Sequence, residues 1–264
     1  RLAFLYENNE EIVLKKDISI APANIKETLD LAYKIANPIC KIADGTVVSE
    51  NLRKYNSAIF ESSLGVSGIG DVGLLLNIVE DYPIAKGRST ASEAKKQVFR
   101  CRCVCIQKEA LDEYYSDIKH EMTNTFSLTD HTANLYVENA EYDLDQTSLE
   151  IAYNNIKTIN GNLISGKIKV KTFAPGPHHV SNVLGVILTC LSLEIESDKI
   201  IKGLENYKGI PGRTTKKTIE NSIIIEEINP VLNTEAIKES INIIQNLKDY
   251  YISIGGDYGI TCEE

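Results

Sequence analysis

The chain has 264 residues, of which 43% are apolar and 25% are charged, and its formal net charge is −9 at pH 7. This composition is typical of a soluble globular protein with one large domain or two ordinary ones. The acidic balance excludes a general nucleic-acid surface, and no apolar run approaches the ~20 residues of a membrane-spanning helix. We therefore expect a cytoplasmic protein that binds neither nucleic acid nor membrane.

The first half of the chain combines short apolar segments with two helix signals. Apolar residues at helical spacing predict a helix over residues 21–36. Residues 57–63 and 71–79 read as strands, the second apolar throughout, as in a sheet covered on both faces. Thr90 and Glu93 stand three apart, which is the spacing of a capping box, so a helix is expected to begin near Thr90.

Three cysteines alternate within residues 100–107, a pattern typical of one face of a strand. No Cys-x-x-C pair occurs anywhere, which argues against a zinc site. We expect these cysteines to be buried and their thiols to be reduced, as is usual in a cytosolic protein. The six cysteines of the chain are Cys40, Cys101, Cys103, Cys105, Cys190 and Cys262.

The second half begins with a half-exposed strand over residues 163–173, where apolar and polar residues alternate. A helix is expected to begin just after Pro177, because apolar residues then recur at helical spacing. A second helix is expected over residues 197–209, with Ser197 as its N-cap and Gly209 as its end.

The pattern changes after a Pro-Gly break at residues 210–213. From there the sequence predicts a strand at 221–228, a helix at 234–250 and a strand at 251–255, which is a βαβ unit of a parallel sheet. We place a domain boundary at this break, giving domains 1–210 and 211–264.

Carboxylates and polar side chains follow two of the expected strands. Glu61 ends one of them, and Asn77, Glu80 and Asp81 end the next. Ligands of open parallel sheets bind at the carboxyl ends of strands, and carboxylates there suit Mg²⁺. A solvated turn that carries acids for solubility explains the same residues.

Further candidate residues are Lys95, the adjacent pair His178 and His179, and Arg213. Lys95 is expected near the start of a helix and belongs either to a site or to a solvated helix face. His178 and His179 precede a helix and are adjacent, which disfavours a two-histidine zinc site. Arg213, at the domain joint, is either a hinge residue that reaches a phosphate or a surface charge.

Six segments, taken in chain order, resemble the Mur ligase superfamily from about Ile59 onward. They are "FESSLGVSGIGDVGLLLNIVEDYPIA" continued by "SEAKKQVF", "NTFSLTDHTANLYVEN", "APGPHHVSNVLGVILTCLSL", "KIIKGLENYKGIPGR", "INPVLNTEAI" and "GGDYGITCEE". Members of that superfamily are ATP-dependent ligases that activate a carboxylate as an acyl phosphate. The resemblance implies an α/β fold: a parallel-sheet ATP-binding central domain, incomplete at its N-terminus, and part of a Rossmann-like C-terminal domain.

The form of these segments is most similar to the methanogen branch that makes the nickel tetrapyrrole coenzyme F-430. The implied reaction is closure of a carbocyclic ring on a nickel tetrapyrrole acid, with ATP and Mg²⁺ as cofactors. One alternative is a pseudomurein or peptidoglycan-type ligase that joins an amino acid to a peptide precursor. The other is a nucleotide-binding relative without catalysis.

The resemblance also implies roles for individual residues. Glu61 matches the Mg²⁺-binding glutamate of the family, and Lys95 matches a lysine that is carbamylated in many members to hold a second metal. Asn77 matches an asparagine near the nucleotide. The remaining matches are His178 and Asn182, on a Gly-x-His-Asn-x-x-Asn pattern whose last residue approaches adenine, and Arg213, which faces ATP from the hinge.

The chain departs from the family at several positions. Tyr82 follows Asp81 where the family has a metal-binding histidine, and His179 stands where the family has asparagine. No Gly-Lys-Thr or Gly-Lys-Ser occurs, so the phosphate-cradling loop of the family is absent from these residues. We expect a fragment that lacks this loop and is inactive by itself; a degenerate relative is the alternative.

Overall fold

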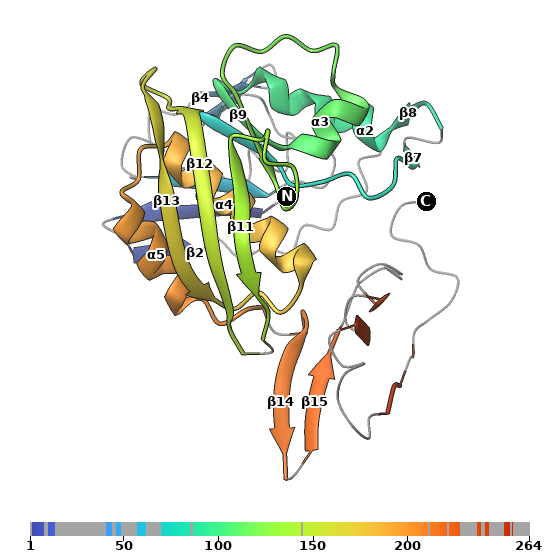
Figure 1. The fold of residues 1–264 in the computed structure, drawn as a ribbon. Helices are drawn as coiled ribbons and strands as arrows, with labels where there is room; N and C mark the ends of the chain where they lie inside the picture. The colour runs from blue at the N-terminus through green and yellow to red at the C-terminus, as the bar shows by residue number, and fades with distance from the viewer. Residues whose placement is uncertain are drawn as a thin grey trace. The chain divides into compact units, whose positions relative to one another are not determined.

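The computed structural model describes the backbone of five short strands within residues 1–69 and most of the chain beyond (Figure 1). The ranges described after residue 69 are 70–84, 87–143, 145–210, 212–220, 222–227, 237–238, 241–242, 251–253 and residue 255. The helix expected over residues 21–36 lies outside the described residues. Among those that are described, no helix has the length and apolar character needed to cross a membrane.

The chain divides into two compact units. The first joins Arg1–Gly73 to Ile78–Arg102, and the second joins Leu74–Asn77 to Cys103–Cys262. These units do not test the domain boundary that the sequence predicts at residue 210, which stays a prediction.

The first unit contains a three-stranded antiparallel sheet. Strand β1 (Leu2–Glu7) lies between β2 (Glu10–Val13) and β5 (Ser57–Glu61). The strand expected over residues 57–63 is confirmed as β5, but its described neighbour runs antiparallel, not parallel. Antiparallel pairing satisfies the backbone N–H and C=O groups of β5 as fully as parallel pairing would. A separate hairpin pairs β3 (Lys41–Ala43) with β4 (Thr46–Val48).

The rest of the first unit is a small hairpin followed by helix. Strand β7 (Pro83–Ile84) pairs antiparallel with β8 (Ser89–Thr90). Helix α2 (Ala91–Lys95) follows directly and continues as the 3₁₀-helix η2 (Lys96–Arg100). The helix expected to begin near Thr90 is therefore confirmed.

A six-stranded mixed sheet forms the centre of the second unit, in the order β13-β12-β11-β10-β9-β6. Strand β10 pairs parallel with both β9 and β11, whereas β12 pairs antiparallel with both β11 and β13. The expected α/β class with a parallel central region is confirmed. The strands are β6 (Val72–Leu75), β9 (Cys103–Gln107), β10 (Thr123–Ser127), β11 (Leu135–Glu141), β12 (Thr147–Lys157) and β13 (Leu163–Thr172).

Helix α4 (Pro177–Ser192) packs apolar side chains against this sheet. It begins at Pro177, as the sequence predicts, and packs against β9, β10, β11 and β12 (Figure 1). Gly185 lets α4 lie close to the segment that follows β6, because a Cβ atom at position 185 would lie 2.6 Å from the Leu76 side chain. The side chains that α4 buries completely are Val180, Leu184, Ile187 and Leu188. The shorter α3 (Lys108–Tyr114) packs on β9 and β10.

Helix α5 (Ser197–Asn206) packs on β13 and begins one residue earlier than its expected cap implies. Ser197 was expected to be the N-cap, but the N-cap is Glu196, whose backbone is not helical. The Glu196 carbonyl accepts the first helical hydrogen bonds, from the N–H groups of Lys199 and Ile200. A serine already inside the helix cannot cap it from outside.

The cysteines of β9 lie inside the second unit. Cys103 and Cys105 are buried on one side of the strand, and Cys101 is buried just before it, so only two of the three alternating cysteines belong to the strand. These three cysteines carry reduced thiols, and so does the partly exposed Cys190. The expectation of buried, reduced thiols is confirmed for the three buried ones. Cys40 and Cys262 lie outside the described residues.

The chain after residue 213 forms an antiparallel hairpin of β14 (Thr215–Ile219) and β15 (Ser222–Glu226). The strand expected over residues 221–228 is confirmed as β15. The strand expected over residues 251–255 is wrong for residues 251–253, which have no regular secondary structure. A strand requires a hydrogen-bonded neighbour, and the described partner of β15 is β14. Most of the helix expected over residues 234–250 lies outside the described residues.

Candidate functional site

Asn77 lies two residues beyond the carboxyl end of β6, and it is exposed. Leu74 and Leu76, on the same segment, meet α4 at Gly185, so the segment is held against the helix while Asn77 stays accessible. A polar side chain beyond the carboxyl end of a sheet strand is where open α/β sheets bind ligands. Asn77 therefore stands beyond the end of β6, and its role near the nucleotide stays a prediction.

Asp81 fixes the beginning of α2 in the first unit. Its Oδ1 atom accepts a hydrogen bond of 2.8 Å from the Ser92 backbone N–H, and its Oδ2 accepts one of 2.7 Å from the Ser92 hydroxyl. The Ser92 backbone bond is the main reason why the pKa of Asp81 lies below its usual value. The carboxylate therefore acts as a clamp across eleven residues of chain.

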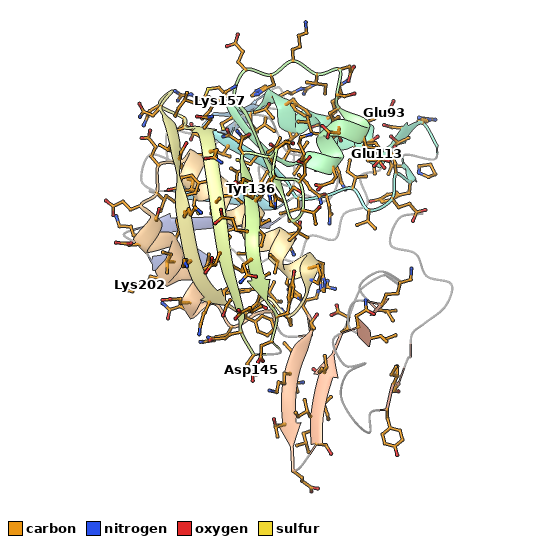
Figure 2. All side chains as sticks on the ribbon, in the orientation of Figure 1. Glu93, Glu113, Tyr136, Asp145, Lys157 and Lys202 are labelled. Carbon is orange, nitrogen blue, oxygen red and sulfur yellow. The ribbon has the colours of Figure 1, made fainter. Side chains whose placement is uncertain are left out.

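A complete capping box supports the same helix terminus. The Thr90 hydroxyl accepts a hydrogen bond from the Glu93 N–H at 3.3 Å, and the Glu93 carboxylate accepts one from the Thr90 N–H at 3.1 Å. Glu93, labelled in Figure 2, also accepts a bond from the Ser89 hydroxyl. The capping box and the Asp81 clamp together satisfy N–H groups that a helix terminus otherwise leaves without partners.

Replacing Asp81 with alanine should lower the free energy of unfolding by about 1 kcal/mol, because Ser92 loses the acceptor of its backbone N–H. Urea unfolding followed by circular dichroism measures the change. Asp71→Ala is the matched control, since Asp71 is exposed and lies outside the clamp. Equal effects of the two substitutions would refute the clamp.

Lys95 is the last residue of α2, and it is partly exposed. The sequence suggested a place in the first turn; the structure corrects this, because α2 begins at Ala91 and has only five residues. The positive charge of Lys95 is one of the smaller causes that lower the pKa of Asp81. Lys95 and the Asp81 clamp thus lie close enough to interact electrostatically.

Glu61 is the last residue of β5, where it stands opposite Leu2 of β1. Its side chain lies outside the described residues. Glu61 and Lys95 both belong to the first unit, whereas Asn77, His178, Asn182 and Arg213 belong to the second. The convergence of all six on one site therefore stays a prediction.

The first turns of α4 carry His178 and Asn182 on one face, because residues four apart on a helix are neighbours. His178 is partly exposed and Asn182 is exposed. The ring of His178 lies 4.3 Å from that of His179, centroid to centroid, so the adjacent histidines do contact each other. No group of three potential metal ligands occurs among the described His, Cys, Asp and Glu residues.

His179 belongs to a hydrogen-bonded series that the sequence did not reveal. Its Nε2 atom lies 2.9 Å from the Thr214 Oγ1 atom, and the Thr214 hydroxyl donates to the Glu227 carboxylate at 2.5 Å. Because the single hydroxyl proton of Thr214 goes to Glu227, the His179 Nε2–H must donate to Thr214. The series links α4, the segment after residue 210 and the end of β15.

Burial lowers the pKa of His179 from its ordinary value of 6.5 to about 4, with a further lowering by His178 and an opposing effect of Glu227. The ring is therefore neutral at pH 7. Its Nε2–H tautomer is the form that the Thr214 hydroxyl requires.

This pKa predicts how stability depends on pH. Between about pH 4 and 6.5 the unfolded chain protonates His179 and the folded chain does not, so the contribution of this group to stability falls as the pH falls through that window. Above about pH 6.5 the contribution is complete and constant. Urea unfolding of His179→Asn should show a weaker pH dependence there, whereas the exposed control His131→Asn should not. Identical slopes for both variants would contradict the assignment.

Arg213 lies in a turn next to Thr214 and is partly exposed. The Arg213 N–H donates to the Ile210 carbonyl at 3.0 Å, and the Gly212 N–H donates to the Thr215 hydroxyl at 3.0 Å. Gly209, just upstream, has a φ of +81°, and a Cβ atom there would lie 2.5 Å from Phe173. Glycine is therefore required at that position by conformation and by space.

Sequence reasoning missed Asp81 as a structural clamp and missed Thr214 and Glu227 altogether. The capping box was visible as a local spacing, but the Asp81–Ser92 pair spans eleven residues and follows no local pattern. Thr214 and Glu227 are brought to His179 only by the packing of the hairpin region near α4.

Comparison with solved structures defines the class of fold. The chain superimposes on MurF from Acinetobacter baumannii with a TM-score of 0.51 and 16% sequence identity, over 66% of this chain and 37% of that protein. At this level of identity the likeness concerns the fold alone. The fold is that of the Mur ligases, as the sequence segments indicated.

Comparison with sequences narrows the resemblance. Residues 216–264 match the family "Coenzyme F430 synthetase CfbE, C-terminal domain". The chain is 30% identical over 218 residues to coenzyme F(430) synthetase of Methanocaldococcus jannaschii, covering 82% of this chain and 48% of that protein. It is 23% identical over 145 residues to UDP-N-acetylmuramate–L-alanine ligase of Rickettsia felis, covering 55% of this chain and 30% of that protein.

These findings confirm the resemblance to the Mur ligase superfamily and, within it, to the coenzyme F430 synthetase branch. The chain spans about half the length of its Methanocaldococcus relative and less than a third of its Rickettsia relative.

Proposed function

We propose that the complete protein is an ATP-dependent ligase that activates a carboxylate as an acyl phosphate. We further propose that its substrate is a nickel tetrapyrrole acid, on which it closes the carbocyclic ring of coenzyme F-430. The observation that carries this proposal is the 30% identity to coenzyme F(430) synthetase over 82% of the chain. The match of residues 216–264 to the C-terminal domain of the same family supports it independently.

The proposed chemistry has two steps. A carboxylate oxygen of the substrate attacks the γ-phosphorus of ATP, ADP leaves, and an acyl phosphate forms. A carbon nucleophile of the same molecule then loses its proton and attacks the acyl carbon, and inorganic phosphate leaves with the former carboxylate oxygen. Mg²⁺ would neutralise charge on the transferring phosphoryl group.

Glu61 and Lys95 are the residues proposed to hold Mg²⁺. Glu61 supplies a hard oxygen donor at the end of β5. Lys95 would supply another after carbamylation, in which its neutral amine attacks CO₂, forms an N–C bond and releases a proton. The Asp81 clamp supports this role because it fixes the short helix that carries Lys95.

Four residues of the second unit are proposed to bind the nucleotide. Asn77 follows strand β6 and Asn182 lies within helix α4, and both side chains are exposed. His178 shares a helix face with Asn182, which suits contact with one planar base. Arg213 carries a guanidinium group and is partly exposed, which suits contact with a phosphate.

The second candidate function is ligation of an amino acid to a peptide precursor by the same activation. The similarity to the Rickettsia UDP-N-acetylmuramate–L-alanine ligase favours it, at lower identity and coverage.

The test is phosphate release by the complete protein with ATP and Mg²⁺. We expect release that depends on a nickel tetrapyrrole carboxylic acid, accompanied by loss of one water from the tetrapyrrole in its mass spectrum. Release that depends on an amino acid and a peptide instead would establish the second candidate. ATP binding without release in either mixture would identify a non-catalytic relative.

A further inference from the structure

We propose that His179, Thr214 and Glu227 form a hydrogen-bonded latch that holds the chain around Arg213 against the first turn of α4. In this proposal His179 is a positioning residue for Arg213. The latch itself is independent of the reaction, but its consequence for ATP rests on the proposed function.

The three residues come from three separate places in the second unit. His179 lies in the first turn of α4, Thr214 lies between the Pro-Gly break and β14, and Glu227 follows β15. The Nε2–Oγ1 distance is 2.9 Å and the Oγ1–Oε2 distance is 2.5 Å. The Thr214 hydroxyl therefore receives one hydrogen bond and donates another, and these join the helix to both strands of the hairpin.

The backbone of Thr214 adopts a conformation that it would avoid without support. Its φ is +48°, in the left-handed region that β-branched residues rarely occupy. A strained backbone of this kind persists only where the surroundings determine it, and the two hydrogen bonds of the hydroxyl are such surroundings. The left-handed backbone of Thr214 and the hydrogen bonds of its hydroxyl both indicate that this residue is held in one conformation.

Burial makes both hydrogen bonds of the hydroxyl necessary. Thr214 is only 2% exposed, so water does not replace a lost partner at low cost. The neutral His179 ring supplies its Nε2–H without placing an extra charge beside His178. Glu227 supplies the acceptor at the other end.

Phe173 also contacts the latch. Its ring meets His179 edge-on, with centroids 5.9 Å apart, and it also packs against Gly209. The same aromatic side chain therefore limits the movement of His179 and of the chain that leads to Arg213. Edge-to-face contacts of this kind add orientation to simple burial.

The latch bears on Arg213 because Arg213 and Thr214 are adjacent in the chain. Fixing the φ of Thr214 and both partners of its hydroxyl leaves the preceding peptide little rotational freedom. The direction in which the Arg213 side chain leaves the backbone is then set by His179 and Glu227. An asparagine at position 179, as in the family pattern, is shorter than histidine and would not reach the hydroxyl from the same backbone.

The first test uses trypsin, which cleaves after Arg213. Thr214→Val keeps the shape and the β-branch but removes the hydroxyl, so cleavage at Arg213 should become about tenfold faster. Thr214→Ser restores the hydroxyl and should return the rate to within about twofold of the parent chain. Thr218→Val, on the exposed part of β14, is the matched control and should leave the rate unchanged. Circular dichroism verifies that each variant is folded.

The second test observes His179 directly by ¹H–¹⁵N NMR of the imidazole rings in the complete protein. The parent chain should show a neutral Nε2–H tautomer that exchanges slowly with water, and Thr214→Val should lose that slow exchange. Unchanged cleavage at Arg213 together with unchanged His179 signals in Thr214→Val would overturn the latch.

The third test separates the latch from the proposed function. In the complete protein, Thr214→Val should raise the KM for ATP about tenfold and leave kcat within about twofold, with recovery in Thr214→Ser. If the NMR and trypsin results hold while ATP is not bound by any variant, the proposed function fails and the latch stands. If KM for ATP is the same in all variants, His179 is not a positioning residue for Arg213.

Discussion

Replacing Glu61 with alanine in the complete protein is expected to lower the rate of ATP-dependent phosphate release at least about a thousandfold. Removing a carboxylate that binds Mg²⁺ removes several kcal/mol of transition-state stabilisation, and each 1.36 kcal/mol is a factor of about ten. Phosphate release is measured at saturating ATP, so that a change in nucleotide affinity does not contribute. Because loss of a ligand lowers the affinity for Mg²⁺, the residual activity should also require a higher Mg²⁺ concentration.

Glu113→Ala is the control for this substitution. Glu113 is an exposed carboxylate of α3, and it was never a candidate for the site. We expect it to retain activity within about twofold, while the circular dichroism of both variants matches that of the parent. Activity of Glu61→Ala within a few-fold of the parent would remove Glu61 from the metal site.

Replacing Lys95 with alanine is expected to reduce phosphate release about a hundredfold or more. A positive amine beside bound Mg²⁺ would repel it, whereas a carbamate supplies one more oxygen ligand, so the activity should also rise with added bicarbonate in the parent protein. The partial exposure of Lys95 leaves its amine accessible to CO₂. Mass spectrometry under native conditions would detect the carbamate directly.

Lys96 offers a matched control one residue further along. It is exposed, and it begins η2 instead of ending α2. Lys96→Ala should retain nearly full activity and should not alter the bicarbonate response. Equal losses in the two alanine variants would show that the effect arises from helix stability and not from a carbamate.

The sequence alone was sufficient wherever the determining interactions are local. The Thr90–Glu93 spacing predicted the capping box, and the apolar spacing after Pro177 predicted α4, because both depend on residues within one or two turns. The alternation in residues 163–173 predicted β13 and its buried side. The six ordered segments predicted the Mur ligase fold and the coenzyme F430 synthetase resemblance, which the comparisons confirmed.

Reasoning from local sequence failed for the exact residues at which helices begin and end. Lys95 was expected in the first turn of its helix and stands in the last, because α2 ends after five residues and becomes 3₁₀. Ser197 was expected to cap α5, but Glu196 does so. Caps and 3₁₀ ends are decided by backbone dihedrals that residue type only biases.

Only the tertiary structure placed the long-range polar contacts. Asp81 reaches Ser92 across the β7–β8 hairpin, and His179 reaches Thr214 across 35 positions. The sequence by itself determined the class of fold, the local elements and the list of candidate residues, since each follows from patterns or segments readable in order. Which of those residues touch was decided by chain packing, because side chains far apart in sequence meet only after the sheet and helices have closed around them.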